Sequence, residues 1–111
     1  MTWRVVYLPE AEDDFRSLDG SQRIMVRKAL AKLQTNPLPA EEGGYGRWLG
    51  NHSGTKLAGF LKVKLRGAGL RIVYRLHQEG EQILVIVIGF REDSEVYEEA
   101  ERRIKKENSI M

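Results

Sequence analysis

Two stretches of alternating apolar and basic residues constrain the fold of this chain more than any other feature. They are Leu61–Arg66 and Leu70–Leu76, with Gly67 and Gly69 between them. Because successive side chains of a strand point to opposite faces, this pattern predicts a β-hairpin with one apolar and one cationic face. The cations expected on the second face are Lys62, Lys64, Arg66, Arg71 and Arg75. Positive charges gathered in this way repel one another unless an anion binds, so the hairpin indicates a polyanionic partner.

The basic character of this region is local. Residues 43–78 contain no Asp or Glu, although the formal net charge of the whole chain is only +2. A chain of 111 residues is long enough for one compact core and short for two, so we expect a single domain over residues 1–111. Cysteine is missing from the composition, which excludes disulfides and thiolate metal sites and suits a cytoplasmic protein. The longest apolar run, Ile83–Ile88, is far below the roughly 20 residues of a membrane helix.

The amino-terminal part predicts a strand followed by two helices. Thr2–Leu8 is rich in residues that favour strands, and Pro9 suits the first turn of a helix. Ser21 is expected to cap the second helix, and Asn36 with Pro37 is expected to end it. A long loop rich in glycine and proline follows, and loops of that length in compact domains are usually functional or mobile.

The carboxy-terminal part predicts one more strand and one more helix. Gln82–Ile88 is apolar on both sides, which is typical of a central strand covered on both faces, and Gly89 ends it. The last helix is expected to begin at Asp93 or Ser94. The predicted class is therefore α+β, in the order β-α-α-β-β-β-α, with a small antiparallel sheet packed on a helical hairpin and a carboxy-terminal helix.

Two segments resemble the RelE branch of the RelE/ParE toxin superfamily. The first runs from Leu61 to Arg75 and carries paired lysines on one strand and an Arg-apolar-apolar-Tyr pattern on the next. The second runs from Val87 to Tyr97, with an arginine shortly before a Ser-Glu-Val-Tyr helix start. The expected element order agrees with this superfamily over nearly the whole chain. The family often carries further basic residues where this chain has Phe90 and Asp93.

The resemblance implies an activity and a partner. RelE-like toxins are endonucleases that cut mRNA in the ribosomal decoding site and are held inactive by a cognate antitoxin. The expected partners are thus an antitoxin protein and mRNA on the ribosome, with contacts to ribosomal RNA, and neither a membrane nor a cofactor nor a metal is expected. The positions that match the family's catalytic motif are Lys62, Lys64, Arg71, Arg91 and Tyr97.

RNA cleavage without a metal needs a group that activates a 2′-hydroxyl, cations that stabilise the transition state and a group that protonates the leaving 5′-oxygen. We expect Lys62 and Lys64 to assist deprotonation of the 2′-hydroxyl, and Arg71 to hold the scissile phosphate. Arg91 is expected to stabilise or protonate the leaving oxygen, and Tyr97 to stack on a base. Three further cations are expected to bind the RNA backbone. These are Lys56, Arg66 and Arg75.

Each assignment has a structural alternative. Lysines that alternate along an exposed strand, such as Lys62 and Lys64, are commonly solvated protection of a sheet edge. Arg91 can pair with Glu95 at the helix start, and Tyr97 can belong to the packing side of the last helix. At the level of function, the alternatives are a ParE-like inhibitor of DNA gyrase and a toxin homologue that binds RNA or the ribosome without catalysis.

Overall fold

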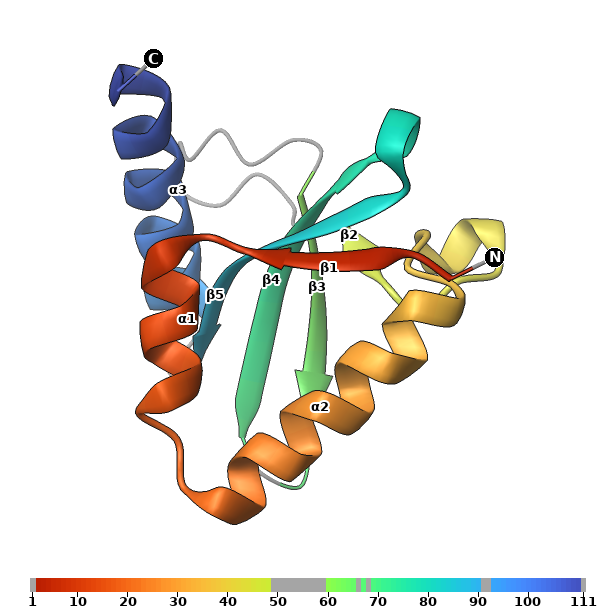
Figure 1. Cartoon of the computed structure of the whole chain (residues 1–111), viewed down its shortest axis with the longest axis horizontal. Helices are drawn as coiled ribbons and strands as arrows, with labels where there is room; N and C mark the ends of the chain where they lie inside the picture. The colour runs from red at the N-terminus through yellow and green to blue at the C-terminus, as the bar shows by residue number, and fades with distance from the viewer. Residues whose placement is uncertain (1, 49–59, 66, 68, 91–92, 111) are drawn as a thin grey trace.

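The computed structural model of this chain describes residues 2–48, 60–65, 67, 69–90 and 93–110, and within them every side chain except those of 78, 93, 94 and 107–110 (Figure 1). Its helices and strands follow one another in the order β1 (Arg4–Tyr7), α1 (Pro9–Arg16), α2 (Gly20–Thr35), η1 (Ala40–Glu42), β2 (Arg47–Trp48), β3 (Phe60–Leu65), β4 (Leu70–His77), η2 (Gln78–Gly80), β5 (Gln82–Gly89) and α3 (Asp93–Ile110). The predicted α+β class and element order are confirmed, with one strand added.

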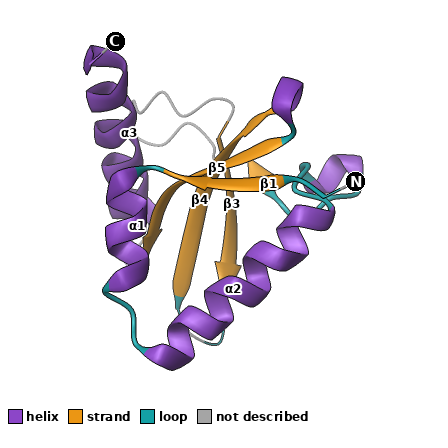
Figure 2. Ribbon diagram, in the orientation of Figure 1, coloured by secondary structure: helices purple, strands orange, loops and turns teal. Residues whose placement is uncertain are grey.

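A five-stranded sheet forms the centre of the fold, in the spatial order β1-β5-β4-β3-β2 (Figure 2). The predicted hairpin is present, since β3 and β4 pair antiparallel from Leu65 opposite Leu70 to Phe60 opposite Arg75. β5 lies between β4 and β1, which confirms the prediction of a central strand.

Two features of the sheet differ from the prediction. β2 lies within the region expected to be a loop, where it pairs antiparallel with β3. β1 pairs with β5 in parallel, so the sheet is mixed rather than wholly antiparallel. Neither feature is visible in the local pattern, because two residues are too few to show alternation and strand direction depends on how α1 and α2 return the chain.

The ends of the helices follow from short-range chemistry. Pro9 occupies the first turn of α1, where its missing N–H leaves no hydrogen bond unmade. α2 begins with a capping box, in which the Asp19 carboxylate accepts from the backbone N–H of Gln22 and the Gln22 side chain accepts from the N–H of Asp19. The expectation that Ser21 caps this helix is therefore wrong. Its hydroxyl instead donates to Asp19, because the capping box places the helix start two residues earlier.

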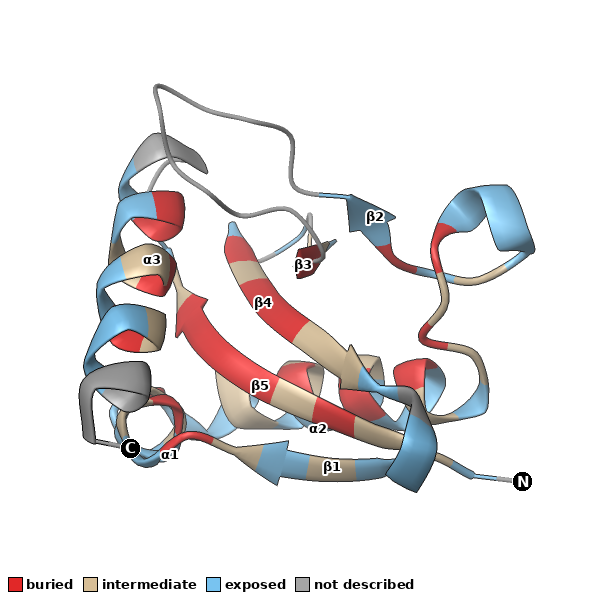
Figure 3. Ribbon diagram, turned by 90° about the horizontal axis from the view of Figure 1, so that it is seen from above, coloured by how far each residue is buried: buried red, intermediate tan, exposed pale blue. Residues whose placement is uncertain are grey.

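Helices cover both faces of the sheet, and Figure 3 shows buried residues along β4 and β5 and on the inward sides of the helices. Successive residues of β3 point to the two faces of the sheet. Val63 lines a cavity with residues of α2, whereas the residue before it, Lys62, contacts Tyr97 of α3. Burial of each large apolar side chain contributes about 1.5–3 kcal/mol. The most deeply buried residues of the helices are Ala11, Val26, Leu33, Val96 and Ala100.

The segment between α2 and β2 is folded tightly onto the sheet. The backbone N–H of Gly46 donates to the carbonyl of Leu38 at 3.1 Å, and the Gly46 carbonyl accepts from Ala40 at 2.8 Å. The hydroxyl of Tyr74, buried in β4, donates to the carbonyl of Pro37 at 2.9 Å. The loop predicted to be functional or mobile is thus anchored over residues 36–46, and this anchoring determines where β2 begins.

Candidate nucleic-acid interface

Strand register brings cations from three neighbouring strands to one side of the sheet. Lys64 of β3 lies opposite Arg71 of β4, and Lys62 lies opposite Arg47 of β2. Residues directly opposite each other in an antiparallel pair point to the same side. Arg75 follows Arg71 at even spacing on β4 and shares that side. We call this set the cationic face, made up of Arg47, Lys62, Lys64, Arg71 and Arg75.

Helix α3 covers one part of the cationic face. The ammonium group of Lys62 donates to the hydroxyl oxygen of Tyr97 at 2.5 Å and lies 5.2 Å from the centroid of its ring. Tyr97 is only 2% exposed and packs beside Val96 and Ala100, as the structural alternative for this residue expected. In this conformation the ring of Tyr97 is covered and has no face open to a base. Its hydroxyl, however, determines the position of the Lys62 ammonium group.

The remainder of the cationic face is more open. Lys64 is exposed, and Arg71 is half-buried. The guanidinium of Arg75 lies 5.9 Å from the ring centroid of Phe60, which keeps it against the sheet. On this face Lys64 lines a cavity of about 290 Å³ together with Arg47 and one of about 180 Å³ together with Arg71, and it also lines a larger groove beside α2. The arrangement can bind an extended anion and stabilise negative charge on it.

Comparison with known proteins assigns the family. No protein-family profile matches the chain. The chain is 33% identical over 94 residues to the mRNA interferase toxin RelE of Escherichia coli. The aligned region covers 82% of this chain and 85% of that protein. This chain belongs to the RelE toxin family.

Solved structures of the family share this fold. A variant of the E. coli toxin RelE in the free state matches with a TM-score of 0.69 at 30% identity, over 94% of this chain and 99% of that chain. A RelE variant in complex with an antitoxin RelBc peptide matches with a TM-score of 0.66 at 27% identity, over 90% of this chain and 95% of that chain.

Three of the predicted site residues, Lys56, Arg66 and Arg91, lie outside the described residues. The structure also adds Arg47 to the cationic face of this RelE-family chain. The sequence shows Arg47 only as one member of a basic region, because its pairing with Lys62 depends on a strand of two residues. Within the described ranges, no three His, Asp or Glu side chains are grouped to ligate a metal ion. No helix in the described part of the chain is long and apolar enough to cross a membrane.

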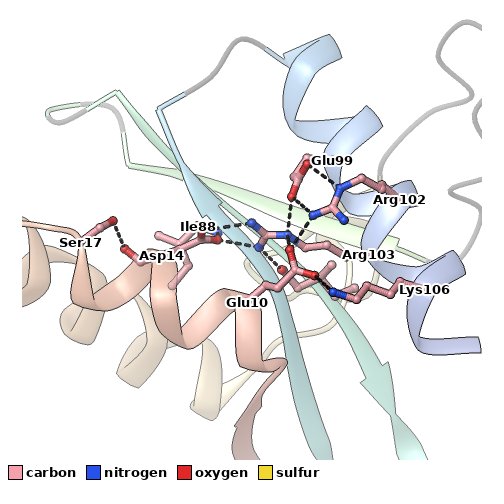
Figure 4. Close-up of polar contacts among 9 residues, drawn as sticks. Glu10, Asp14, Ser17, Ile88, Glu99, Arg102, Arg103 and Lys106 are labelled. Atoms are coloured by element: carbon pink, nitrogen blue, oxygen red, sulfur yellow. Dashed lines mark hydrogen bonds and ion pairs between the residues drawn. The ribbon is translucent and has the colours of Figure 1, made fainter. Parts of the chain in front are cut away.

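A buried ion cluster holds α3, the helix that carries Tyr97, against α1 and β5 (Figure 4). The guanidinium of Arg103, in a residue only 8% exposed, donates to Asp14 of α1 at 2.7 Å and to Glu99 of α3 at 2.7 Å. It also donates to the backbone carbonyl of Ile86 in β5 at 2.8 Å. Asp14 in turn accepts from the backbone N–H of Ile88 at 3.0 Å. The sequence patterns predict the helices but not this cluster, in which one arginine joins α1, α3 and β5.

Hydrogen bonds in and beside the cluster shift the pKa values of Glu99 and Arg103. Hydrogen bonds from Arg102, and then from Arg103, lower the pKa of the Glu99 carboxyl to about 2, against the burial that would raise it. Burial by itself would lower the pKa of Arg103, but the hydrogen bonds to Asp14 and Glu99 outweigh it and raise this pKa. Both shifts favour the charged forms of Glu99 and Arg103.

Proposed function

We propose that this chain is the toxin of a toxin–antitoxin pair and an endoribonuclease that cleaves mRNA in the ribosomal A site in the cytoplasm. A relative at 33% identity is named an mRNA interferase toxin, which supports nuclease activity in general. The observation that carries the proposal is the register of β3 and β4, which places Lys64 opposite Arg71 on a face that also holds Lys62. Cations fixed by backbone pairing are preorganised for a phosphate and need little rearrangement during reaction.

In the reaction that we propose, the 2′-oxygen of one nucleotide attacks the adjacent phosphorus. A bond forms between them, the bond to the 5′-oxygen of the next nucleotide breaks, and that oxygen takes up a proton. The products are a 2′,3′-cyclic phosphate and a free 5′-hydroxyl. Arg71 holds the scissile phosphate, and Arg91 stabilises or protonates the leaving oxygen. Loss of one preorganised donor of this kind typically lowers the rate by about 10²–10³-fold.

The two lysines differ in their surroundings, which favours different roles. Lys62 donates a hydrogen bond to the Tyr97 hydroxyl, an arrangement that suits a protonated ammonium group stabilising charge on the phosphate. Lys64 is exposed beside Arg71, and we assign to it the removal of the 2′-hydroxyl proton. Tyr97 then acts by positioning Lys62. Lys56, Arg66 and Arg75 are proposed to bind the RNA backbone.

Lysine and arginine are weak acids and bases for such a reaction at neutral pH. They need an RNA whose 2′-oxygen, phosphorus and 5′-oxygen are already close to in-line geometry. Positioning of this kind contributes up to about 7–11 kcal/mol to lowering a reaction barrier. A ribosome that holds mRNA in its A site can supply it, which is the reason for proposing ribosome dependence.

The antitoxin partner is supported by a second surface. A groove of about 420 Å³ lies between α2 and β3, with an apolar floor that includes Met25, Ala29 and Val63. Lys28 and Lys32 form part of its rim. An antitoxin segment with apolar and acidic residues complements this groove in shape and charge. The similar RelE variant bound to an antitoxin RelBc peptide supports a protein partner of this class.

The deciding experiment maps new mRNA 5′ ends after brief induction of the chain in bacteria. Wild type is compared with the double variant Arg71→Ala/Arg91→Ala, and with Arg16→Ala as an exposed control on α1. We expect cuts in phase with codons for wild type and the control, and none for the double variant. Cuts are expected only in translated RNA if the ribosome positions the substrate.

Two outcomes would favour the alternatives. Growth arrest with DNA breaks and no new RNA ends would indicate a ParE-like gyrase inhibitor. Growth arrest with neither DNA breaks nor RNA ends, abolished by the double variant, would indicate a toxin that binds RNA or the ribosome without cutting.

A further inference from the structure

A cavity at the β2 edge of the cationic face lies beside the proposed catalytic lysines. Its volume is about 290 Å³, near the lower end of small-ligand pockets, which suits a group the size of one nucleotide. Of the five described residues that line it, three are cations, one is aromatic and none is acidic. The lining residues are Tyr45, Arg47, Lys62, Val63 and Lys64.

We propose that this cavity is a subsite for the nucleotide next to the scissile bond, in which Arg47 binds the phosphate and Tyr45 contacts the base. The proposal rests on the proposed function, because the same RNA must reach Lys64. Arg47 is exposed and makes no ion pair with any carboxylate in the described part of the chain. Its planar guanidinium can bind two phosphate oxygens at once, which the ammonium group of a lysine cannot do in the same geometry.

The position of Tyr45 suits the proposed contact with the base. Tyr45 is 44% exposed, so it is accessible to a partner. The ammonium group of Lys32 lies 4.4 Å from the ring centroid, so a cation–π contact with α2 restrains the ring. An aromatic ring beside cations is the usual means of holding single-stranded RNA, because every base has a flat face and every nucleotide has a phosphate.

The backbone that carries Arg47 is held rigidly, which a subsite requires. Gly46 precedes Arg47, and a Cβ at this position would lie 2.1 Å from the hydroxyl oxygen of Tyr74. Only glycine therefore allows the chain to pass this close to β4. Immediately after Gly46, Arg47 enters the sheet opposite Lys62. The position of Arg47 relative to the lysines is therefore set by sheet pairing and by the anchored segment before it.

The test compares Arg47→Ala, Arg47→Lys and Arg4→Ala in the full chain. Arg4 is an exposed arginine on β1, the opposite edge strand of the same sheet, so its removal changes the net charge equally. The probe is a single-stranded RNA dodecamer, with Kd measured by fluorescence anisotropy at several salt concentrations. Cleavage of mRNA on programmed ribosomes is measured in parallel, with circular dichroism to verify folding.

We expect Arg47→Ala to weaken RNA binding by about fivefold to tenfold at 0.1 M salt and to reduce the salt slope by about one. Arg47→Lys should recover the salt slope and only part of the affinity. Arg4→Ala should match wild type. In the cleavage assay the loss for Arg47→Ala should appear mainly in KM, because the phosphate contact positions the substrate. Tyr45→Ala should weaken binding by about tenfold with an unchanged salt slope.

Failure of the subsite and failure of the nuclease proposal give different results. Equal Kd values and salt slopes for Arg47→Ala and Arg4→Ala would overturn the subsite, whether or not RNA is cut. RNA binding that depends on Arg47 without cleavage by wild type would support the subsite and overturn the nuclease. A wild-type chain that binds no RNA at low salt and cuts no mRNA on programmed ribosomes would overturn both.

Discussion

Replacing Arg103 with methionine removes the centre of the buried ion cluster that holds α3 in place. Methionine retains a long unbranched side chain, but Asp14 and Glu99 lose the guanidinium that they share. Removal of one member of a buried ion pair costs about 3–5 kcal/mol, because the remaining charge stays desolvated. Asp14 keeps its hydrogen bond from the backbone N–H of Ile88, so we expect the lower end, about 3 kcal/mol.

The neighbouring residue offers a matched control. The side chain of Arg102 is 52% exposed, although it also bonds to Glu99 and Glu10. Solvent screens ion pairs of this exposure, so Arg102→Met should lower the free energy of unfolding far less than Arg103→Met. Urea unfolding at pH 7, followed by far-UV circular dichroism, measures both variants. For a domain of this size, 3 kcal/mol corresponds to a fall in Tm of about 12–24 °C.

The comparison of the two arginines decides the argument. Equal losses for Arg103→Met and Arg102→Met would refute the reasoning, because burial would then make no difference. A loss near 3 kcal/mol confined to Arg103→Met would show that the cluster stabilises the position of α3. Because α3 carries Tyr97, the same variant should also lower RNA cleavage, measured at a temperature where the chain is folded.

Three further predictions concern acid stability, the lysine contact and the anchored loop. The pKa of Glu99 is lowered from 4.5 to about 2 in the folded chain, so the ionised carboxylate stabilises the fold above about pH 4.5, and this contribution is lost as the pH falls toward 2. The difference in unfolding free energy between wild type and Glu99→Gln should therefore shrink over that pH range. A constant difference would contradict this reasoning. Tyr97→Phe removes the acceptor for the Lys62 ammonium group. It should lower the single-turnover cleavage rate by about 10- to 100-fold, which corresponds to the loss of one hydrogen bond to a charged group, and should leave the far-UV spectrum unchanged. Gly46→Ala places a carbon against a buried tyrosine hydroxyl and should cost about 1–3 kcal/mol in urea unfolding, whereas Gly20→Ala, which meets no atom within 4 Å, should cost nothing measurable.

Several parts of the fold could be predicted because they depend on short segments. Alternation over Leu61–Arg66 and Leu70–Leu76 predicted the hairpin, and the register of β3 and β4 confirms it. The segment Gln82–Ile88, which is apolar on both sides, predicted a central strand, and β5 is that strand. The start of α2 was placed wrongly, because Asp19 and Ser21 are both good caps and only the capping box distinguishes them.

The candidate site, too, was predictable from the sequence only in part. Alternation predicted that Lys62, Lys64 and Arg71 share one face, and the strand pairing is consistent with it. Their roles in cleavage stay predictions. Arg47 was not predicted as part of the site, because membership depends on the pairing of a two-residue strand that shows no periodicity.

By itself the sequence determined the helices, the hairpin and the presence of a cationic face, since capping, turn formation and alternation act over a few neighbouring residues. Only the tertiary structure decided which of these residues meet. The contact between Lys62 and Tyr97 joins positions 35 residues apart, and that between Arg103 and Asp14 joins positions 89 residues apart. Such contacts depend on strand order and helix packing across the whole chain, so that one arginine of the last helix becomes the buried centre of an ion cluster while its neighbour stays in solvent.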